Sequence, residues 1–107
     1  MNVLIIEDEA AAVTRLRKML VEIDPTTQVV ADVPTIRQAV EWIKNNPAPD
    51  LALFDVQLAD GESFAIFQQV EVDFPMIFIT AFEEYAIKAF RVNALDYLLK
   101  PLKKAEL

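Results

Sequence analysis

Hydrophobic residues along this chain gather in five short runs, and the segments between the runs repeat hydrophobic residues at helical spacing. The runs occupy residues 3–6, 28–33, 51–54, 76–79 and 95–99. Between the first two runs, Val13, Leu16, Leu20 and Ile23 recur every three to four residues, which predicts an amphipathic helix. The later stripes are Ile36, Ala39, Val40 and Ile43, then Phe64, Phe67 and Val70, then Ala86, Ala89 and Phe90. Strand and helix alternate, which indicates an α/β fold with an open parallel sheet covered on both faces.

Polar residues within the runs indicate the order of the five strands. The first, third and fourth runs are unbroken hydrophobic segments, as expected of strands buried on both faces. The second and fifth runs contain polar residues, among them Asp32 and Asp96, and therefore suit the edges of the sheet. These features predict the order 2-1-3-4-5, the flavodoxin-like doubly wound arrangement. Ligands bind at the carboxyl ends of the strands where such a sheet reverses direction, so candidate site residues directly follow the strands.

Composition limits the classes of function. A length of 107 residues and the absence of a linker-like stretch predict one domain, and 54% hydrophobic residues are enough for a packed core. The net charge of −7 argues against direct nucleic-acid binding by this domain. Without cysteine or histidine, the sequence excludes disulfides, Zn-His sites and histidine-based triads. We expect neither a signal peptide nor a membrane span, because the start has no basic region and no apolar run approaches about 20 residues.

Acidic residues follow the first and third strands at the predicted rim. Glu7, Asp8 and Glu9 end the first strand, and Asp55 ends the third. Crowded carboxylates repel one another, and burial raises their pKa values unless a cation compensates. Mg²⁺ suits such a place because it prefers oxygen ligands and keeps several waters. We expect Asp8 and Asp55 to bind Mg²⁺ directly, Glu7 to act through water, and a backbone carbonyl past Asp55 to add a ligand. Alternatively, the three adjacent acids simply complement the start of the following helix.

Asp55 directly follows an apolar strand, which is a costly position for a carboxylate without a chemical role. Carboxylates can act as nucleophiles that form acyl phosphates, and phosphoryl transfer needs mainly positioning and charge neutralisation. Lys100, at the end of the fifth strand, offers a compact cation, and Thr80, at the end of the fourth, offers a hydroxyl donor. Taken singly, Asp55 could cap a turn, and Lys100 and Thr80 could be ordinary strand-end polar residues. Their shared rim favours a phosphoryl-accepting site.

The same motifs resemble a known family in order and over nearly the whole chain. The segment LIIEDE at residues 4–9, Asp55, Thr80-Ala81 and Lys100-Pro101 resemble the acidic pair, phosphoacceptor, switch threonine and lysine–proline of CheY-like receiver domains of response regulators. The resemblance implies two-component phosphorelay signalling, with Asp55 accepting the phosphoryl group from a sensor histidine kinase. It implies no enzymatic activity beyond self-catalysed phosphotransfer and autodephosphorylation, and it implies a bacterial, cytoplasmic protein.

Further residue roles also follow from this resemblance. It implies Mg²⁺ as cofactor, bound by Asp8, Asp55 and the backbone carbonyl of Gln57, with Glu7 as the outer acid. Lys100 would pair with the phosphoryl oxygens, and the bond between Lys100 and Pro101 would be cis. Tyr97 falls at the position of the family's rotating aromatic residue, so we expect Thr80 and Tyr97 to form the switch. The face built by the fourth helix and fifth strand is expected to mediate homodimerisation.

The loop sequences narrow the resemblance. The segment DVQLADG at residues 55–61 is shorter than in many receivers and lacks their proline, and with residues 80–86 and 93–101 it resembles LytTR-type (LytR/AlgR-like) regulators. Such regulators imply a DNA-binding output domain that controls transcription. Only residues 102–107 follow Pro101, too few for a last helix of about three turns. We therefore expect a single receiver domain over residues 1–107 with an incomplete last helix, and an output domain outside it.

Three alternatives remain open. A haloacid-dehalogenase-like phosphohydrolase also uses an aspartyl nucleophile, but it needs Asp-x-Asp after the first strand, and Glu7-Asp8-Glu9 does not fit. A flavodoxin-like cofactor carrier needs phosphate loops rich in small residues, whereas this chain has one glycine, Gly61. A pseudo-receiver would be an interaction module without phosphorylation.

Overall fold

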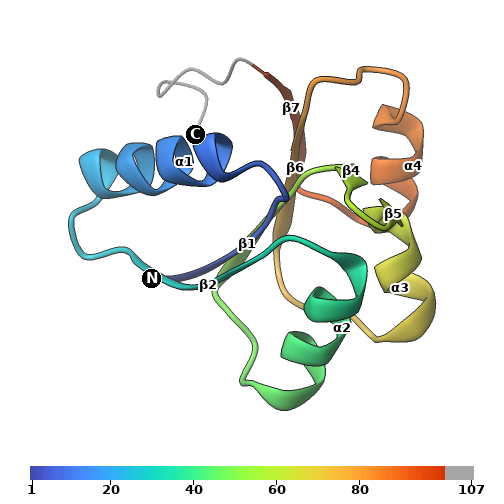
Figure 1. Cartoon of the computed structure of the whole chain (residues 1–107), viewed down its shortest axis with the longest axis horizontal. Helices are drawn as coiled ribbons and strands as arrows, with labels where there is room; N and C mark the ends of the chain where they lie inside the picture. Colours follow the sequence, from blue (N-terminus) through green and yellow to red (C-terminus); the bar gives the residue numbers. More distant parts are fainter. Residues whose placement is uncertain (101–107) are drawn as a thin grey trace.

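The structure is a computed structural model that describes residues 1–100, and five parallel strands form its centre (Figure 1). The strands are β1 (Asn2–Ile6), β2 (Gln28–Val33), β3 (Leu51–Phe54), β6 (Met76–Thr80) and β7 (Asp96–Leu99). Their order is β2-β1-β3-β6-β7 and each neighbouring pair is parallel, so the predicted 2-1-3-4-5 order is confirmed. The first, third and fourth predicted strands lie inside the sheet, and the two that contain polar residues form its edges.

Helices cover the two faces of the sheet unequally. The helical elements are α1 (Ala10–Ile23), α2 (Ile36–Asn45), the 3-10 turn η1 (Ser63–Ala65), α3 (Ile66–Gln69) and α4 (Ala86–Arg91). In Figure 1, α1 lies on one side of the sheet, and α2, α3 and α4 lie on the other. The core is divided in the same way, because successive residues of a strand point to opposite faces. Val3 and Ile5 pack with Leu16 of α1, whereas Leu4 and Ile6 pack with the helices of the other face.

Two details of the predicted helical stripes are wrong. Ile23 is 47% exposed, because it is the last residue of α1 and lies beyond the part of the helix that packs on the sheet. The third predicted stripe does pack on the core: Phe64 and Phe67 are partly buried against it, beside the completely buried Ile66. In α4 only Ala89 is buried, and Phe90 is 82% exposed, because the next residue of a helix points about 100° away.

A small element interrupts the loop after β3. Strand β4 (Gln57–Leu58) pairs antiparallel with β5 (Gly61–Glu62), with Gln57 opposite Glu62. Val56 and Leu58 are buried in the core, and the Ser63 N–H donates to the Val56 carbonyl at 2.7 Å. The loop is therefore folded as a short hairpin at the rim of the sheet.

Two predictions lie outside the described residues: the cis bond to Pro101 and the incomplete last helix. Within residues 1–100, none of the helices combines the length and the apolar character that a membrane span requires.

Candidate functional site

Strand register brings the sequence-predicted residues to one rim. Ile6 of β1 is paired with Phe54 of β3, so Glu7 and Asp55 are the next residues on adjacent strands. The Asp55 N–H donates to the Ile6 carbonyl at 2.8 Å, which keeps Asp55 beside the end of β1. At the other end of the rim, the Lys100 N–H donates to the Thr80 carbonyl at 2.9 Å. The carboxyl ends of the three inner strands β1, β3 and β6 and of the edge strand β7 thus contribute to the site.

Three carboxylates are concentrated at this rim. Glu7, Asp8 and Asp55 each offer an oxygen within 4.8 Å of the others. Glu7 is buried at 3% exposure, the Asp55 side chain is 11% exposed, and Asp8 is exposed. The Asp8 N–H donates to the Glu7 carboxylate at 3.1 Å. The cluster is open to solvent on the side of Asp8 and closed on the side of Glu7.

One cation reaches into the cluster from β7. The Lys100 ammonium donates to the Glu7 carboxylate and to Asp55 Oδ2, the latter at 3.1 Å. Although burial acts to lower the pKa of Lys100, its hydrogen bonds to Glu7 and Asp55 raise that pKa above its usual value. Lys100 is therefore a charged donor at neutral pH.

The carboxylates outnumber the cation, and Glu7 shows the consequence. Burial first of all, and then a hydrogen bond with Asp55, raise the pKa of Glu7 to about 7 in spite of the opposing effect of Lys100. In addition, Asp55 Oδ1 is buried and accepts no hydrogen bond from residues 1–100. A buried polar atom without a partner needs a compensating group. An unsatisfied carboxylate oxygen amid excess negative charge fits a hard divalent cation, so this donor set suits Mg²⁺.

Thr80 is the last residue of β6, and Tyr97 lies in the neighbouring strand β7. Thr80 is completely buried, and its hydroxyl accepts a long hydrogen bond of 3.4 Å from the Phe82 N–H. The Tyr97 hydroxyl donates to the Phe82 carbonyl, and its ring lies 6.3 Å from the Phe78 ring. Thr80 and Tyr97 are thus both bonded to the backbone of Phe82, so the residue after Ala81 links the two.

Gln57 lies in the β4–β5 hairpin, and its side chain donates to the Tyr85 hydroxyl at 3.3 Å. Sequence reasoning missed the hairpin, whose two loop residues are Ala59 and Asp60. It also missed Asp60 itself, whose carboxylate accepts from the backbone N–H groups of Ile36 and Arg37. No local sequence signal joins residues that are 23 and 24 positions apart.

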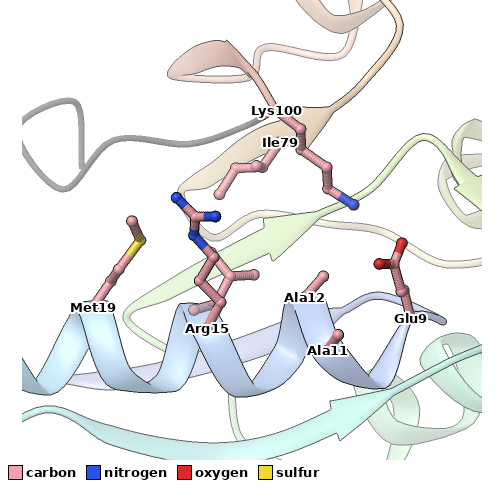
Figure 2. Close-up of a pocket in the computed structure, with 8 residues that line it drawn as sticks. Glu9, Ala11, Ala12, Arg15, Met19, Ile79 and Lys100 are labelled. Carbon is pink, nitrogen blue, oxygen red and sulfur yellow. The ribbon is translucent and has the colours of Figure 1, made fainter.

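A hollow of about 380 Å³ borders the site along α1. Figure 2 shows Ala11, Ala12 and Met19 on the helix side and Ile79 and Lys100 on the sheet side. The small side chains of Ala11 and Ala12 leave room between α1 and the sheet, so the aliphatic part of the Lys100 side chain lines this hollow.

Comparison with known proteins gives a consistent picture. The sequence profile described as "Response regulator receiver domain" matches residues 3–107. The chain is 34% identical over 104 residues to the sensory transduction protein LytT of Bacillus anthracis, and 30% identical over 110 residues to the positive alginate biosynthesis regulatory protein of Pseudomonas aeruginosa. These matches cover 94% and 100% of this chain, but only 42% and 44% of the relatives. The chain therefore spans less than half the length of these curated relatives.

Among solved structures, the response regulatory domain of protein mrkE from Klebsiella pneumoniae has a TM-score of 0.86 at 26% identity. That match covers 99% of this chain and 88% of the other. The LytT and alginate regulators agree with the expected resemblance to LytR/AlgR-like proteins.

Proposed function

This chain belongs to the response regulator receiver domain family, which acts in two-component phosphorelay signalling, and we propose that Asp55 is its phosphoacceptor. The observation that carries the proposal is the state of the Asp55 carboxylate. Its Oδ2 is held by Lys100 at 3.1 Å, while Oδ1 is buried at the carboxyl ends of the strands without a hydrogen-bond partner in the described part of the chain. A carboxylate that is held on one oxygen and unsatisfied on the other is prepared to form a new bond.

The proposed reaction is transfer of a phosphoryl group from the phosphohistidine of a sensor histidine kinase. An Asp55 oxygen attacks the phosphorus, the P–N bond breaks, and its electron pair returns to the imidazole of the donor. The product is an acyl phosphate on Asp55. The donor is external, because this chain contains no histidine. The alternative reading as a pseudo-receiver lacks support, since the cluster retains its acids and its lysine in contact.

Asp8, Asp55 and the backbone carbonyl of Gln57 are the proposed Mg²⁺ ligands, with Glu7 acting through water. The bound ion would neutralise charge on the phosphoryl oxygens during transfer. Lys100 is placed to donate to another phosphoryl oxygen, because its ammonium already contacts Asp55. Each of these groups stabilises charge, and only Asp55 forms the covalent bond.

Thr80 and Tyr97 are the proposed switch. The phosphoryl group adds about −1.5 to −2 charges at neutral pH, and the Thr80 hydroxyl can turn toward it and release its weak bond from Phe82. The space that Thr80 leaves would admit the Tyr97 ring, which now contacts the same Phe82 backbone. A packed side chain with two alternative positions is a bistable element that can change a surface.

That surface is the face of α4 and β7, which we propose as a homodimer interface. Ile87, Phe90 and Leu95 are large apolar side chains that are exposed there. We further propose that the chain acts in the cytoplasm and controls a DNA-binding output of the LytTR type, supported by the similarity to LytT and to the alginate regulator. The domain itself is acidic and is not proposed to bind DNA.

The direct test is incubation with Mg²⁺ and a small acyl phosphate, followed by intact mass and peptide mapping. One phosphoryl group is expected on Asp55, and Asp55→Asn should remain unmodified. Asp73→Asn, an exposed acid in the loop before β6, is the matched control and should be modified like the wild type. A phosphoryl group mapped to Thr80 or Ser63 in the wild type would refute the assignment.

A further inference from the structure

The β4–β5 hairpin carries Gln57, the proposed carbonyl ligand of Mg²⁺, and it lies outside the five-stranded sheet. Each of its strands contains only two residues. An antiparallel pair of this size has little stability by itself. The place of the Gln57 backbone relative to Asp55 therefore depends on contacts between the hairpin and its neighbours.

The most specific of these contacts is made with the start of α2. Asp60 Oδ1 accepts from the Ile36 N–H at 2.8 Å, and Asp60 Oδ2 accepts from the Arg37 N–H at 3.2 Å. The first N–H groups of a helix have no partner within the helix. The side-chain hydroxyl of the local cap, Thr35, accepts from the Gln38 N–H at 3.0 Å. Asp60 thus completes, from a distant loop, the capping that Thr35 begins.

Two further features agree with this anchoring. Gly61 has a φ of +136°, and a Cβ built there would lie 3.4 Å from Ile36 Cδ1, so the hairpin backbone approaches α2 closely. Desolvation acts to raise the pKa of Asp60, but the N–H donors of Ile36 and Arg37 lower it below its usual value. The bound form is therefore the carboxylate, which a helix N-terminus favours.

On the opposite side, the hairpin is tied to α4 by weaker contacts. Lys88 and Glu62 form an ion pair of 3.4 Å between exposed side chains, and Gln57 bonds to the Tyr85 hydroxyl at 3.3 Å. The exposed ion pair contributes little, because solvent screens it and its long side chains lose entropy. Among the polar contacts of the hairpin, those with α2 are therefore the stronger, and they act together with the buried side chains of Val56 and Leu58.

We infer that Asp60 is a positioning residue of the metal site: by binding the first two N–H groups of α2, it holds the hairpin so that the Gln57 carbonyl stays within reach of a cation on Asp55. This inference rests on the proposed function. Without the anchor, the hairpin samples other positions, and cation binding must order it again at an entropic cost. The expected loss appears in Mg²⁺ affinity rather than in the fold.

The test compares Mg²⁺ titrations, followed by backbone amide NMR shifts, of the wild type, Asp60→Ala and Thr35→Ala. Both variants remove a cap from the same helix, but only Asp60→Ala releases the hairpin. We expect Asp60→Ala to bind Mg²⁺ about tenfold more weakly, equivalent to about 1.4 kcal/mol, and Thr35→Ala to bind as the wild type does. Asp60→Asn, which keeps an acceptor oxygen, should give an intermediate loss and serves if Asp60→Ala folds poorly.

Amide hydrogen exchange supplies a readout that does not depend on the metal. Exchange at Ile36 and Arg37 should accelerate in Asp60→Ala, and exchange at Gln38 in Thr35→Ala. Wild-type affinity in Asp60→Ala, or an equal loss in Thr35→Ala, overturns the inference while the metal site stands, provided that Asp8→Asn still weakens binding. Failure of the wild type itself to bind Mg²⁺ overturns the metal site, and the role of Asp60 falls with it.

Discussion

Glu7 offers a quantitative test of the electrostatics of the site. Its carboxyl group is buried, and its pKa is raised from 4.5 to about 7 by burial and by the neighbouring Asp55, after the opposing effect of Lys100. A carboxyl group whose pKa is raised by folding stabilises the protein fully only below its unfolded pKa, and this stability is lost as the pH rises through the folded pKa. The metal-free domain should therefore lose stability between pH 4.5 and about pH 8 on account of Glu7.

The size of this effect follows from the two pKa values. Linkage with 4.5 in the unfolded chain and about 7 in the folded one gives a cost of about 1 kcal/mol at pH 5 and about 3 kcal/mol at pH 8.5. Glu7→Gln keeps the shape of the side chain and removes its ionisation. We therefore expect the free energy of unfolding of Glu7→Gln, relative to the wild type, to rise by about 2.5 kcal/mol between pH 5 and pH 8.5.

Urea unfolding with chelator present, followed by Trp42 fluorescence and circular dichroism, measures both proteins at each pH. Trp42 is partly buried against the core, so its emission should report global unfolding. Glu41→Gln, on the exposed side of α2, is the matched control, and its difference from the wild type should stay within about 0.5 kcal/mol at both values of pH. A relative stability of Glu7→Gln that is independent of pH, or that falls as the pH rises, would refute the reasoning.

Three other predictions concern the proposed chemistry and its output. Asp8→Asn should abolish most Mg²⁺ binding measured by NMR titration, whereas Glu22→Gln, on the last turn of α1, should bind Mg²⁺ normally. Equal binding by the wild type and Asp8→Asn would contradict the proposed ligand set. Lys100→Ala should still be phosphorylated on Asp55, but more slowly by at least about tenfold, because Lys100 neutralises charge and is not the nucleophile; complete absence of the acyl phosphate would show that its role is larger. Phosphorylation should raise self-association measured by sedimentation velocity. Phe90→Ser, on the exposed side of α4, should weaken that association, and Val21→Ser, exposed on α1, should leave it unchanged. A phosphorylated wild type that remains monomeric would exclude the α4–β7 interface.

Much of the fold could be predicted because burial alone distinguishes the strands. Strands inside a doubly wound sheet contact helices on both faces, so their sequences are uniformly apolar, and edge strands alternate. Val3–Ile6 and Gln28–Val33 show the two patterns, and the structure places them inside and at the edge, respectively. The clustering of Glu7, Asp55 and Lys100 followed from the same reasoning, because parallel strands end at one rim.

Features that depend on contacts between distant loops could not be predicted in this way. By sequence, Asp60 is an ordinary turn residue. Only the tertiary fold brings its carboxylate to the N-terminus of α2. The exposure of Phe90 has a similar cause: α4 is six residues long, and its single buried residue, Ala89, fixes which side of so short a helix faces the sheet. A hydrophobic stripe of three residues does not define that rotation.

The contrast between Glu7 and Asp8 shows how a small structural difference determines the chemistry. The two acids are adjacent, and the sequence predicts direct Mg²⁺ binding by Asp8 and a water-mediated role for Glu7. The Glu7 N–H still donates to the Val33 carbonyl at 3.0 Å, so Glu7 continues the pairing of β1 with β2 and its side chain stays buried. Asp8 has left the sheet and is exposed. One acid therefore has a raised pKa and contacts Lys100, while the other faces the solvent from which a hydrated cation would arrive. A single additional backbone hydrogen bond thus keeps Glu7 buried beside Lys100, whereas Asp8, the proposed metal ligand, is exposed.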